Sequence, residues 1–279
     1  MAQELGSILL ECVKPRLEGH SRPWIWGISG LQGSGKSTLA AALVAALPAD
    51  FAVALSLDDF YLSSEQRNAL AREIHPLFAT RGVPGTHEPG LLHDCLDALA
   101  RASPEHPALL PRFDKGRDER LAPGHWPRIS APPRLIVLEG WCLGVPPQAR
   151  QDLVEAVNWL EREEDAQGRW RGHVNAQLAG PYTALWQRID HLTLLQAPCF
   201  AVVERWRGQQ EQALHRDRAP RAMDEAALRR FIAHYERLSR HALASLPAIA
   251  DSVVELDAER RPLAVRVRDP VSGSLIGCA

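Results

Sequence analysis

The nine residues GLQGSGKST at positions 30–38 restrict the possible folds of this chain more than any other stretch. They follow an apolar run, WIWGIS, and precede a run rich in alanine and leucine, LAAALVAAL. A strand, a glycine-rich loop with Gly-Lys-Ser and a helix, in this order, match the phosphate-binding P-loop or Walker A motif. Its glycines let successive backbone N–H groups point at phosphate oxygens, and the helix N-terminus adds a favourable partial charge. The loop therefore predicts a bound polyphosphate.

The polar residues of this loop each have an expected role in binding Mg·ATP. Lys36 reaches the β- and γ-phosphates, the Ser37 hydroxyl coordinates Mg²⁺, and Thr38 supports the α-phosphate. Four further positions are expected to surround the phosphates: Gly30, Gly33, Ser34 and Gly35. The alternative is a glycine-rich turn that only starts a helix, but such a turn requires neither the lysine nor the hydroxyl. We therefore expect ATP and Mg²⁺ as cofactors.

Short apolar runs alternate with longer helical patterns along the chain, which is typical of a parallel sheet covered by helices. The predicted strands are Trp24–Ser29, Phe51–Leu57, Arg134–Leu138, His191–Gln196, Asp251–Leu256 and Pro262–Arg268. The predicted fold is α/β, with the Rossmann-like parallel sheet of a P-loop NTPase in a single kinase domain, 1–279, that begins with a helical extension at 1–23. Residues 75–133 are rich in Pro, Gly, His and Arg, and we expect them to form an irregular insertion that binds the acceptor.

Composition excludes several other classes of protein. The chain has 279 residues, 46% of them hydrophobic, and a net charge of −2, so it can bury a sizeable core but has no broad cationic field for nucleic acid. Five scattered cysteines predict neither a disulfide framework nor a zinc site and favour reduced thiols in the cytoplasm. No stretch is typical of a signal peptide or a membrane span. The oligomeric state and the role of residues 269–279 stay open.

Acidic residues follow two of the predicted strands, at the edge of the sheet where parallel strands bind ligands. Asp58 and Asp59 follow the second strand, and Asp58 is expected to deprotonate an attacking hydroxyl. The alternative is that one of them caps the next helix. Glu139 closes the third strand, LIVLEGW, in a Walker B pattern, which predicts that its carboxylate holds Mg²⁺, although it too could be a helix cap.

The sequence favours a kinase over a nucleotide switch. The only lysines are Lys14, Lys36 and Lys115, and none lies in the N-K-x-D motif that reads guanine. The LSGGQ signature of ABC proteins is also missing. Tryptophans such as Trp141 and Trp206 are expected to pack in the core rather than to stack on a ligand.

Six segments in order, GLQGSGKST, SLDDFYL, RGVPGTHE, PRFDKGRDER, LEGWCLG and VVERWRGQQE, closely resemble the D-glycerate 3-kinase family, which is related to uridine kinase, pantothenate kinase and phosphoribulokinase. The resemblance runs from about residue 24 to 268. It implies ATP-dependent phosphorylation of D-glycerate to 3-phosphoglycerate, with Asp58 as catalytic base and Glu139 as the acid of an EG motif. It also implies a lid helix at 199–215 that brings Arg205 and Arg207 over the ATP phosphates.

Glycerate carries one carboxylate and two hydroxyls, so its site requires cationic and hydrogen-bonding groups. The residues expected to supply them are Asp59, Tyr61, Arg81, His87, Arg112 and Lys115. The chain departs from the family pattern at Val83 and Glu88, where the resemblance leads us to expect Asn and Asp, and its PRFDKGRDER segment is shorter than the family form. A related kinase acting on a nucleoside, pantothenate or a sugar phosphate is one alternative function. A non-catalytic, ATP-dependent regulatory P-loop protein is the other.

Overall fold

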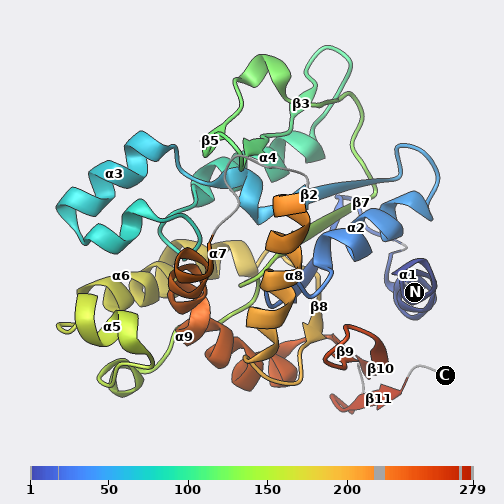
Figure 1. The fold of residues 1–279 in the computed structure, drawn as a ribbon. Helices are drawn as coiled ribbons and strands as arrows, with labels where there is room; N and C mark the ends of the chain where they lie inside the picture. Colours follow the sequence, from blue (N-terminus) through green and yellow to red (C-terminus); the bar gives the residue numbers. More distant parts are fainter. Residues whose placement is uncertain (1, 18, 217–223, 270–271, 278–279) are drawn as a thin grey trace.

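A mostly parallel sheet lies at the centre of the molecule, with helices on both of its faces (Figure 1). The computed structural model describes residues 2–17, 19–216, 224–269 and 272–277. The strands of the sheet are β1 (Trp24–Gly30), β2 (Ala52–Ser56), β7 (Leu135–Gly140), β8 (His191–Gln196), β9 (Ser252–Leu256), β10 (Pro262–Arg268) and β11 (Leu275–Gly277). The six predicted strands are confirmed, with ends that differ by two residues at most.

Among the described residues, the strand order is β11-β10-β9-β8-β1-β7-β2. The five strands from β9 to β2 run parallel, whereas β10 and β11 are antiparallel. Ile28 of β1 lies beside Glu139 of β7, and Ser56 of β2 lies on the other side of Glu139. The carboxyl ends of β1, β7 and β2 therefore meet at one edge of the sheet.

Alternating side chains of the central strands divide the core into two layers, as strand geometry requires. Trp24, Trp26 and Ile28 pack on one side with the helices α1 (Ala2–Val13) and α2 (Lys36–Ala45). Ile25 packs on the other side with α4 (Pro89–Ala100), α6 (Arg169–Gln177) and most of α9 (Glu225–Ile249). Burial of both faces explains why the strands are almost uniformly apolar.

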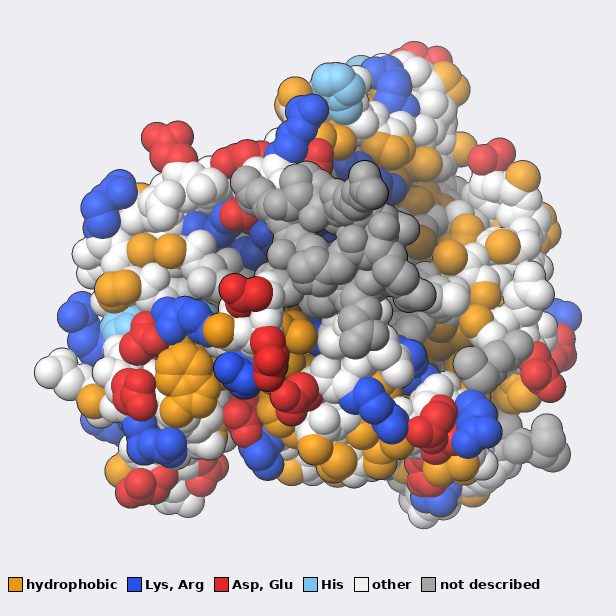
Figure 2. Space-filling model, in the orientation of Figure 1, with side chains coloured by type: hydrophobic (Ala, Val, Ile, Leu, Met, Phe, Trp, Pro, Cys, Tyr) orange, Lys and Arg blue, Asp and Glu red, His pale blue; other side chains and the backbone are white. Residues whose placement is uncertain are grey.

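The other helices are α3 (Ser64–Glu73), α5 (Trp159–Glu164), α7 (Thr183–Trp186) and α8 (Val202–Arg216). Helix α8 contains residues 202–215 of the expected lid region 199–215. Two short antiparallel pairs complete the fold: β3 (Ala108–Leu109) with β6 (Arg128–Ile129), and β4 (Phe113–Asp114) with β5 (Glu119–Arg120). On the face drawn in Figure 2, the coloured acidic and basic side chains are interspersed rather than grouped by charge.

The expectation that residues 75–133 form only irregular structure is wrong for α4, a helix of 12 residues. Pro89 is tolerated because it lies in the first turn of this helix, where its missing N–H has no partner to lose. Leu92, Cys95, Leu96 and Leu99 then recur on one buried face. That apolar spacing was present in the sequence, but the surrounding Pro and Gly obscured it.

The expectation of wholly reduced thiols is wrong at Cys12, which is disulfide-bonded. Cys95, Cys142 and Cys199 are free thiols. Scattered spacing could not reveal this bond, because pairing depends on which residues the fold brings together.

Of the C-terminal segment 269–279, residues 270–271 and 278–279 lie outside the described ranges. No helix among the described residues is long and apolar enough to cross a membrane.

Candidate active site

The P-loop connects the end of β1 to the start of α2 and requires glycine at specific positions. Gly33 has a φ of +81°, and a Cβ atom there would lie 2.8 Å from the Cβ of Trp206 in α8. Gly35 is left-handed as well, with a φ of +96°, and forms the N-cap of α2. Gly30 and Ser34 complete the turn, where Ser34 N donates to Leu31 O at 3.1 Å. The loop is therefore fixed against α8 on one side.

Lys36 is buried at the base of this loop. Its ammonium donates to the carbonyl oxygen of Leu31 at 3.1 Å. Burial lowers the pKa of Lys36, and the nearby carboxylates of Glu139 and Asp58 oppose that shift. The side-chain amide of Gln32 and the hydroxyl of Ser34 are buried, and neither has a hydrogen-bond partner among the described residues. Buried donors of this kind fit an anionic ligand in the loop.

Glu139 joins the P-loop to the ends of two strands. Its Oε1 accepts hydrogen bonds from Ser37 Oγ at 2.9 Å and from Ser56 Oγ at 2.7 Å. These three side chains come from the start of α2, the end of β7 and the end of β2. The Glu139 carboxylate and the Ser37 hydroxyl are oxygen ligands that suit Mg²⁺, and Ser56 orients the carboxylate.

Asp58 and Asp59 point in different directions from the short 3₁₀ turn Leu57–Phe60 that follows β2. Asp58 Oδ2 accepts from Lys115 Nζ at 2.6 Å, whereas Asp59 accepts from Phe113 N at 3.0 Å and from Arg112 Nη1 at 3.2 Å. Asp59 and Arg112 thus fix the insertion to the sheet. Burial alone would raise the pKa of Asp58, but Lys115, helped by His87 and Lys36, lowers it to about 2.

A cavity of about 180 Å³ lies beside the P-loop, and most of these side chains line it. The predicted residues that line it are Gly33, Lys36, Ser37, Asp58, Tyr61, Arg81, Lys115, Glu139 and Arg207. Asp59, His87, Arg112 and Arg205 do not line it. The cavity therefore brings the phosphate-binding lysine, the candidate base and three acceptor-site candidates into one space.

His87 lies beneath the cavity and supports its wall. Its ring stacks on Tyr61, with centroids 4.3 Å apart, and its Nδ1 is 2.8 Å from the hydroxyl of Tyr182. Burial lowers the pKa of His87 to about 4, so the imidazole is neutral at physiological pH. The geometry thus gives His87 a part in placing Tyr61 at the cavity wall.

Arg81 and the loop between β4 and β5 are linked through Asp118. Asp118 accepts from Arg67 Nη2 at 2.5 Å and also from Arg81 Nη1. Glu88, which differs from the family pattern, forms an ion pair with Arg120 at 2.9 Å. These contacts join the RGVPGTHE and PRFDKGRDER segments at one side of the cavity.

Arg205 and Arg207 of α8 occupy different environments. The guanidinium of Arg207 lies over the ring of Phe231 at 5.1 Å and lines the cavity. Arg205 turns the other way, where it pairs with Glu259 at 3.2 Å and donates to the carbonyl of Ala258. Residues two apart on a helix face different directions, and Trp206 between them is fully buried.

Sequence reasoning missed four residues of the cavity wall: Gln32, Trp141, Phe231 and Tyr235. Trp141 is buried, as expected, but it borders the cavity instead of lying wholly in the core. Phe231 and Tyr235 share one face of α9 at a spacing of four, and the hydroxyl of Tyr235 donates to Arg81 O at 3.2 Å. Their spacing along the helix predicts that they are buried, but it does not predict that they line this cavity.

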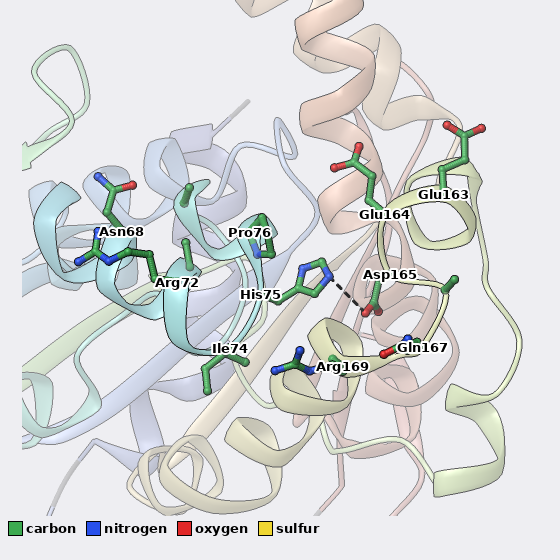
Figure 3. A pocket seen from close by; sticks show the side chains of 13 residues that line it. Asn68, Arg72, Ile74, His75, Pro76, Glu163, Glu164, Asp165, Gln167 and Arg169 are labelled. Carbon is green, nitrogen blue, oxygen red and sulfur yellow. Dashed lines mark ion pairs between the residues drawn. The ribbon is translucent and has the colours of Figure 1, made fainter.

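A larger hollow of about 820 Å³ lies between the α3 region and the segment joining α5 to α6 (Figure 3). It contains none of the predicted site residues. His75 faces Asp165 across it at 3.8 Å, and Asp165 already accepts from the backbone of Trp170 at 2.8 Å. A third hollow, of about 280 Å³, lies on the other side of the P-loop and is lined by Ser34, Gly35 and Thr38. The cavity with Lys36 and Asp58 is therefore the candidate active site.

Comparisons with known proteins point to a kinase family. No family model matches the chain. A Schizosaccharomyces pombe protein with the name "uncharacterized kinase mug58" is 36% identical over 234 residues, which cover 80% of this chain and 81% of that protein. The chloroplastic D-glycerate 3-kinase of Arabidopsis thaliana is 30% identical over 258 residues, 86% of this chain but 54% of the plant protein. The chain thus spans about half the length of the plant protein.

The solved structures show the same fold. The structure of D-glycerate 3-kinase from Cryptococcus neoformans superposes with a TM-score of 0.76 at 24% identity and covers 96% of this chain and 99% of that one. A structure with the name YGR205w protein superposes with a TM-score of 0.75 at 23% identity and covers 95% and 97% of the two chains. At these identities, the likeness supports the fold.

Proposed function

We propose that this chain is a P-loop kinase of the D-glycerate 3-kinase family and that it transfers the γ-phosphoryl group of ATP to D-glycerate, yielding 3-phosphoglycerate. One observation carries the proposal. The base candidate Asp58 and the P-loop lysine Lys36 line the same cavity, and Lys115 faces Asp58 there as a cation for a carboxylate-bearing acceptor.

ATP is proposed to lie across the P-loop with its γ-phosphate toward this cavity. Lys36, the N–H groups of Gly33 and Gly35 and the hydroxyl of Ser34 then surround the phosphates. Arg207 approaches from α8 and offsets negative charge on the transferring group. Thr38 and the hollow beside it lie on the opposite side of the loop, toward the rest of the nucleotide. Arg205 keeps its expected lid role only as a prediction, since it pairs with Glu259 in this structure.

Ser37 and Glu139 are proposed to hold Mg²⁺, because their oxygens lie 2.9 Å apart beside the P-loop. A bound Mg²⁺ would neutralise charge on the phosphates. Ser56 holds the Glu139 carboxylate in place from the end of β2.

The acceptor is proposed to occupy the part of the cavity between Tyr61, Arg81 and Lys115. Arg81 and Lys115 supply cationic donors for its carboxylate, and Asp58 accepts the proton of the hydroxyl that attacks the γ-phosphorus. Three of the expected acceptor residues do not line the cavity but stabilise its wall. Asp59 and Arg112 attach the insertion to the turn after β2, and His87 supports Tyr61. Tyr235 and Trp141 close the cavity and limit the access of water.

An acceptor panel tests the proposal. ADP release by the purified protein with Mg·ATP is measured with D-glycerate, L-glycerate, uridine, pantothenate or no acceptor. The proposal predicts strong stimulation by D-glycerate. Stimulation by uridine or pantothenate instead would identify a related kinase, and ATP binding without stimulation by any acceptor would support a regulatory P-loop protein.

We further propose, as the sequence predicts, that the partner of this protein is a small molecule and that the protein is located in the cytoplasm. Cys95, Cys142 and Cys199 are free thiols, as is usual in a reducing compartment, while the disulfide at Cys12 argues the other way. Cell fractionation with thiol labelling of Cys12 tests the location.

A further inference from the structure

Lys115 contacts the candidate base from an insertion that is otherwise firmly attached. The β4–β5 pair is joined to its surroundings by Arg67 with Asp118 at 2.5 Å, Ser64 N with Glu119 Oε1 at 3.2 Å, and Arg120 with Glu88 at 2.9 Å. Lys115 lies between the two short strands, and its side chain is 62% exposed. The backbone of this segment is therefore held in place, while the long lysine side chain can change its contacts.

The contact of Lys115 with Asp58 conflicts with the role of Asp58 as a base. An ammonium 2.6 Å from the carboxylate stabilises its charged form, so the carboxylate accepts a proton poorly. The Asp58 side chain is 28% exposed, so solvent only partly screens this pair. In the arrangement described here, Asp58 is paired and not ready to receive the proton of a hydroxyl.

The other cations near this wall have partners of their own. Arg81 donates to Asp118, and Arg112 donates to Asp59. Lys36 donates to Leu31 O at the base of the P-loop, on the phosphate side. Of these four cations, Lys115 is the one that pairs with the base itself. A second carboxylate entering the cavity competes with Asp58 for the same ammonium.

We propose that Lys115 changes partners when the acceptor binds, leaving Asp58 for the carboxylate of the acceptor, so that only a carboxylate-bearing acceptor releases the base. This inference rests on the proposed function and adds a selection step to it. Once released, Asp58 takes the hydroxyl proton while the hydroxyl oxygen bonds to the γ-phosphorus and the bond from that phosphorus to the ADP oxygen breaks. The proton passes later to water. Water and uncharged alcohols, which have no carboxylate, leave the base paired.

Binding measurements distinguish this exchange of partners from a permanent ion pair between Lys115 and Asp58. Calorimetry measures D-glycerate binding to wild type, Asp58→Asn, Lys115→Met and Lys14→Met in the presence of Mg·ADP. Asp58→Asn removes the competing charge and keeps an oxygen acceptor, so D-glycerate is expected to bind about two- to fivefold more tightly, the range of a partly exposed ion pair. Lys115→Met is expected to bind at least about tenfold more weakly. Lys14 lies in the short helix Lys14–Arg16, away from the cavity, and serves as the matched control.

Glycerol, which lacks the carboxylate, provides the kinetic test. With Lys115→Met, its slow phosphorylation is expected to rise severalfold while that of D-glycerate falls, because Asp58 is no longer paired. Unchanged or weaker D-glycerate binding by Asp58→Asn, in a variant that melts like wild type, would overturn the exchange and leave the proposed function intact. Absence of D-glycerate binding and phosphorylation in wild type would instead overturn the proposed function and the exchange with it.

Discussion

Gly33→Ala is the substitution whose effect follows most directly from the coordinates. Gly33 has a φ of +81°, and its α-carbon faces Trp206 so closely that an added Cβ would lie 2.8 Å from the Cβ of that tryptophan. The neighbouring atom is at the root of a fully buried side chain, so it cannot rotate away. Either the P-loop or α8 has to move.

Two costs combine in this variant. Placing an alanine in the left-handed region costs about 1–2 kcal/mol. Forcing a methyl group into a well-packed contact costs typically about 1–3 kcal/mol more. The free energy of unfolding is therefore expected to fall by about 2–5 kcal/mol. ATP affinity is expected to fall at least about tenfold, because the N–H groups of the loop no longer converge.

Gly208→Ala is the matched control. Gly208 lies in α8 two residues from Trp206, and an added Cβ would meet no atom of the described residues within 4 Å. Alanine at a helical position is expected to stabilise by about 0.5–1 kcal/mol. Urea denaturation and titration with ATP measure both variants. Wild-type stability and ATP affinity in Gly33→Ala would refute the argument that this loop and α8 define the nucleotide site.

Other substitutions test single groups of the cavity. Asp58→Ala should lower turnover by about 10²–10⁴-fold while the dissociation constant of ATP stays near that of wild type; normal turnover would remove Asp58 from the base role. Glu139→Gln should raise the Mg²⁺ concentration for half-maximal activity about tenfold or more, measured by metal titration, and an unchanged titration would contradict the metal role. Arg207→Ala should reduce kcat by about a hundredfold, whereas Arg205→Ala should have a smaller effect because Arg205 faces Glu259; equal losses would place both over the phosphates. Burial raises the pKa of Asp58 and Lys115 brings it down to about 2, so Lys115→Met should move the acid limb of kcat/KM to higher pH, and an unmoved limb would contradict the pairing.

The sequence was sufficient to place the central strands and the P-loop, because their signals are local. Each central strand is a short apolar run, and the runs end at Gly30, Ser56 and Gly140, where the polar site begins. The P-loop places Lys36 and Ser37 through backbone geometry alone. The Walker B acid Glu139 follows from its place at the end of β7. For these residues, position in the chain nearly determines position in space.

The positions of the residues around the expected acceptor could not be predicted from the sequence in the same way. Asp58 and Asp59 are neighbours in the sequence, and which of them faces the cavity depends on the 3₁₀ turn and on where Phe113 donates its N–H. Tyr235 comes from a helix far along the chain, and only the packing of α9 brings it to Arg81. Contacts between distant segments depend on tertiary packing, which carries no local pattern in a single sequence.

The central claim is that this cavity transfers the γ-phosphoryl group of ATP to D-glycerate. ³¹P NMR of a reaction with Mg·ATP and D-glycerate, run with wild type and with Asp58→Ala, tests it most directly. The account predicts that the γ-phosphate signal of ATP is replaced by the phosphomonoester signal of 3-phosphoglycerate in wild type and that this signal is absent at the same time point in the variant. Inorganic phosphate alone, a different phosphoester, or equal product from both proteins would contradict it.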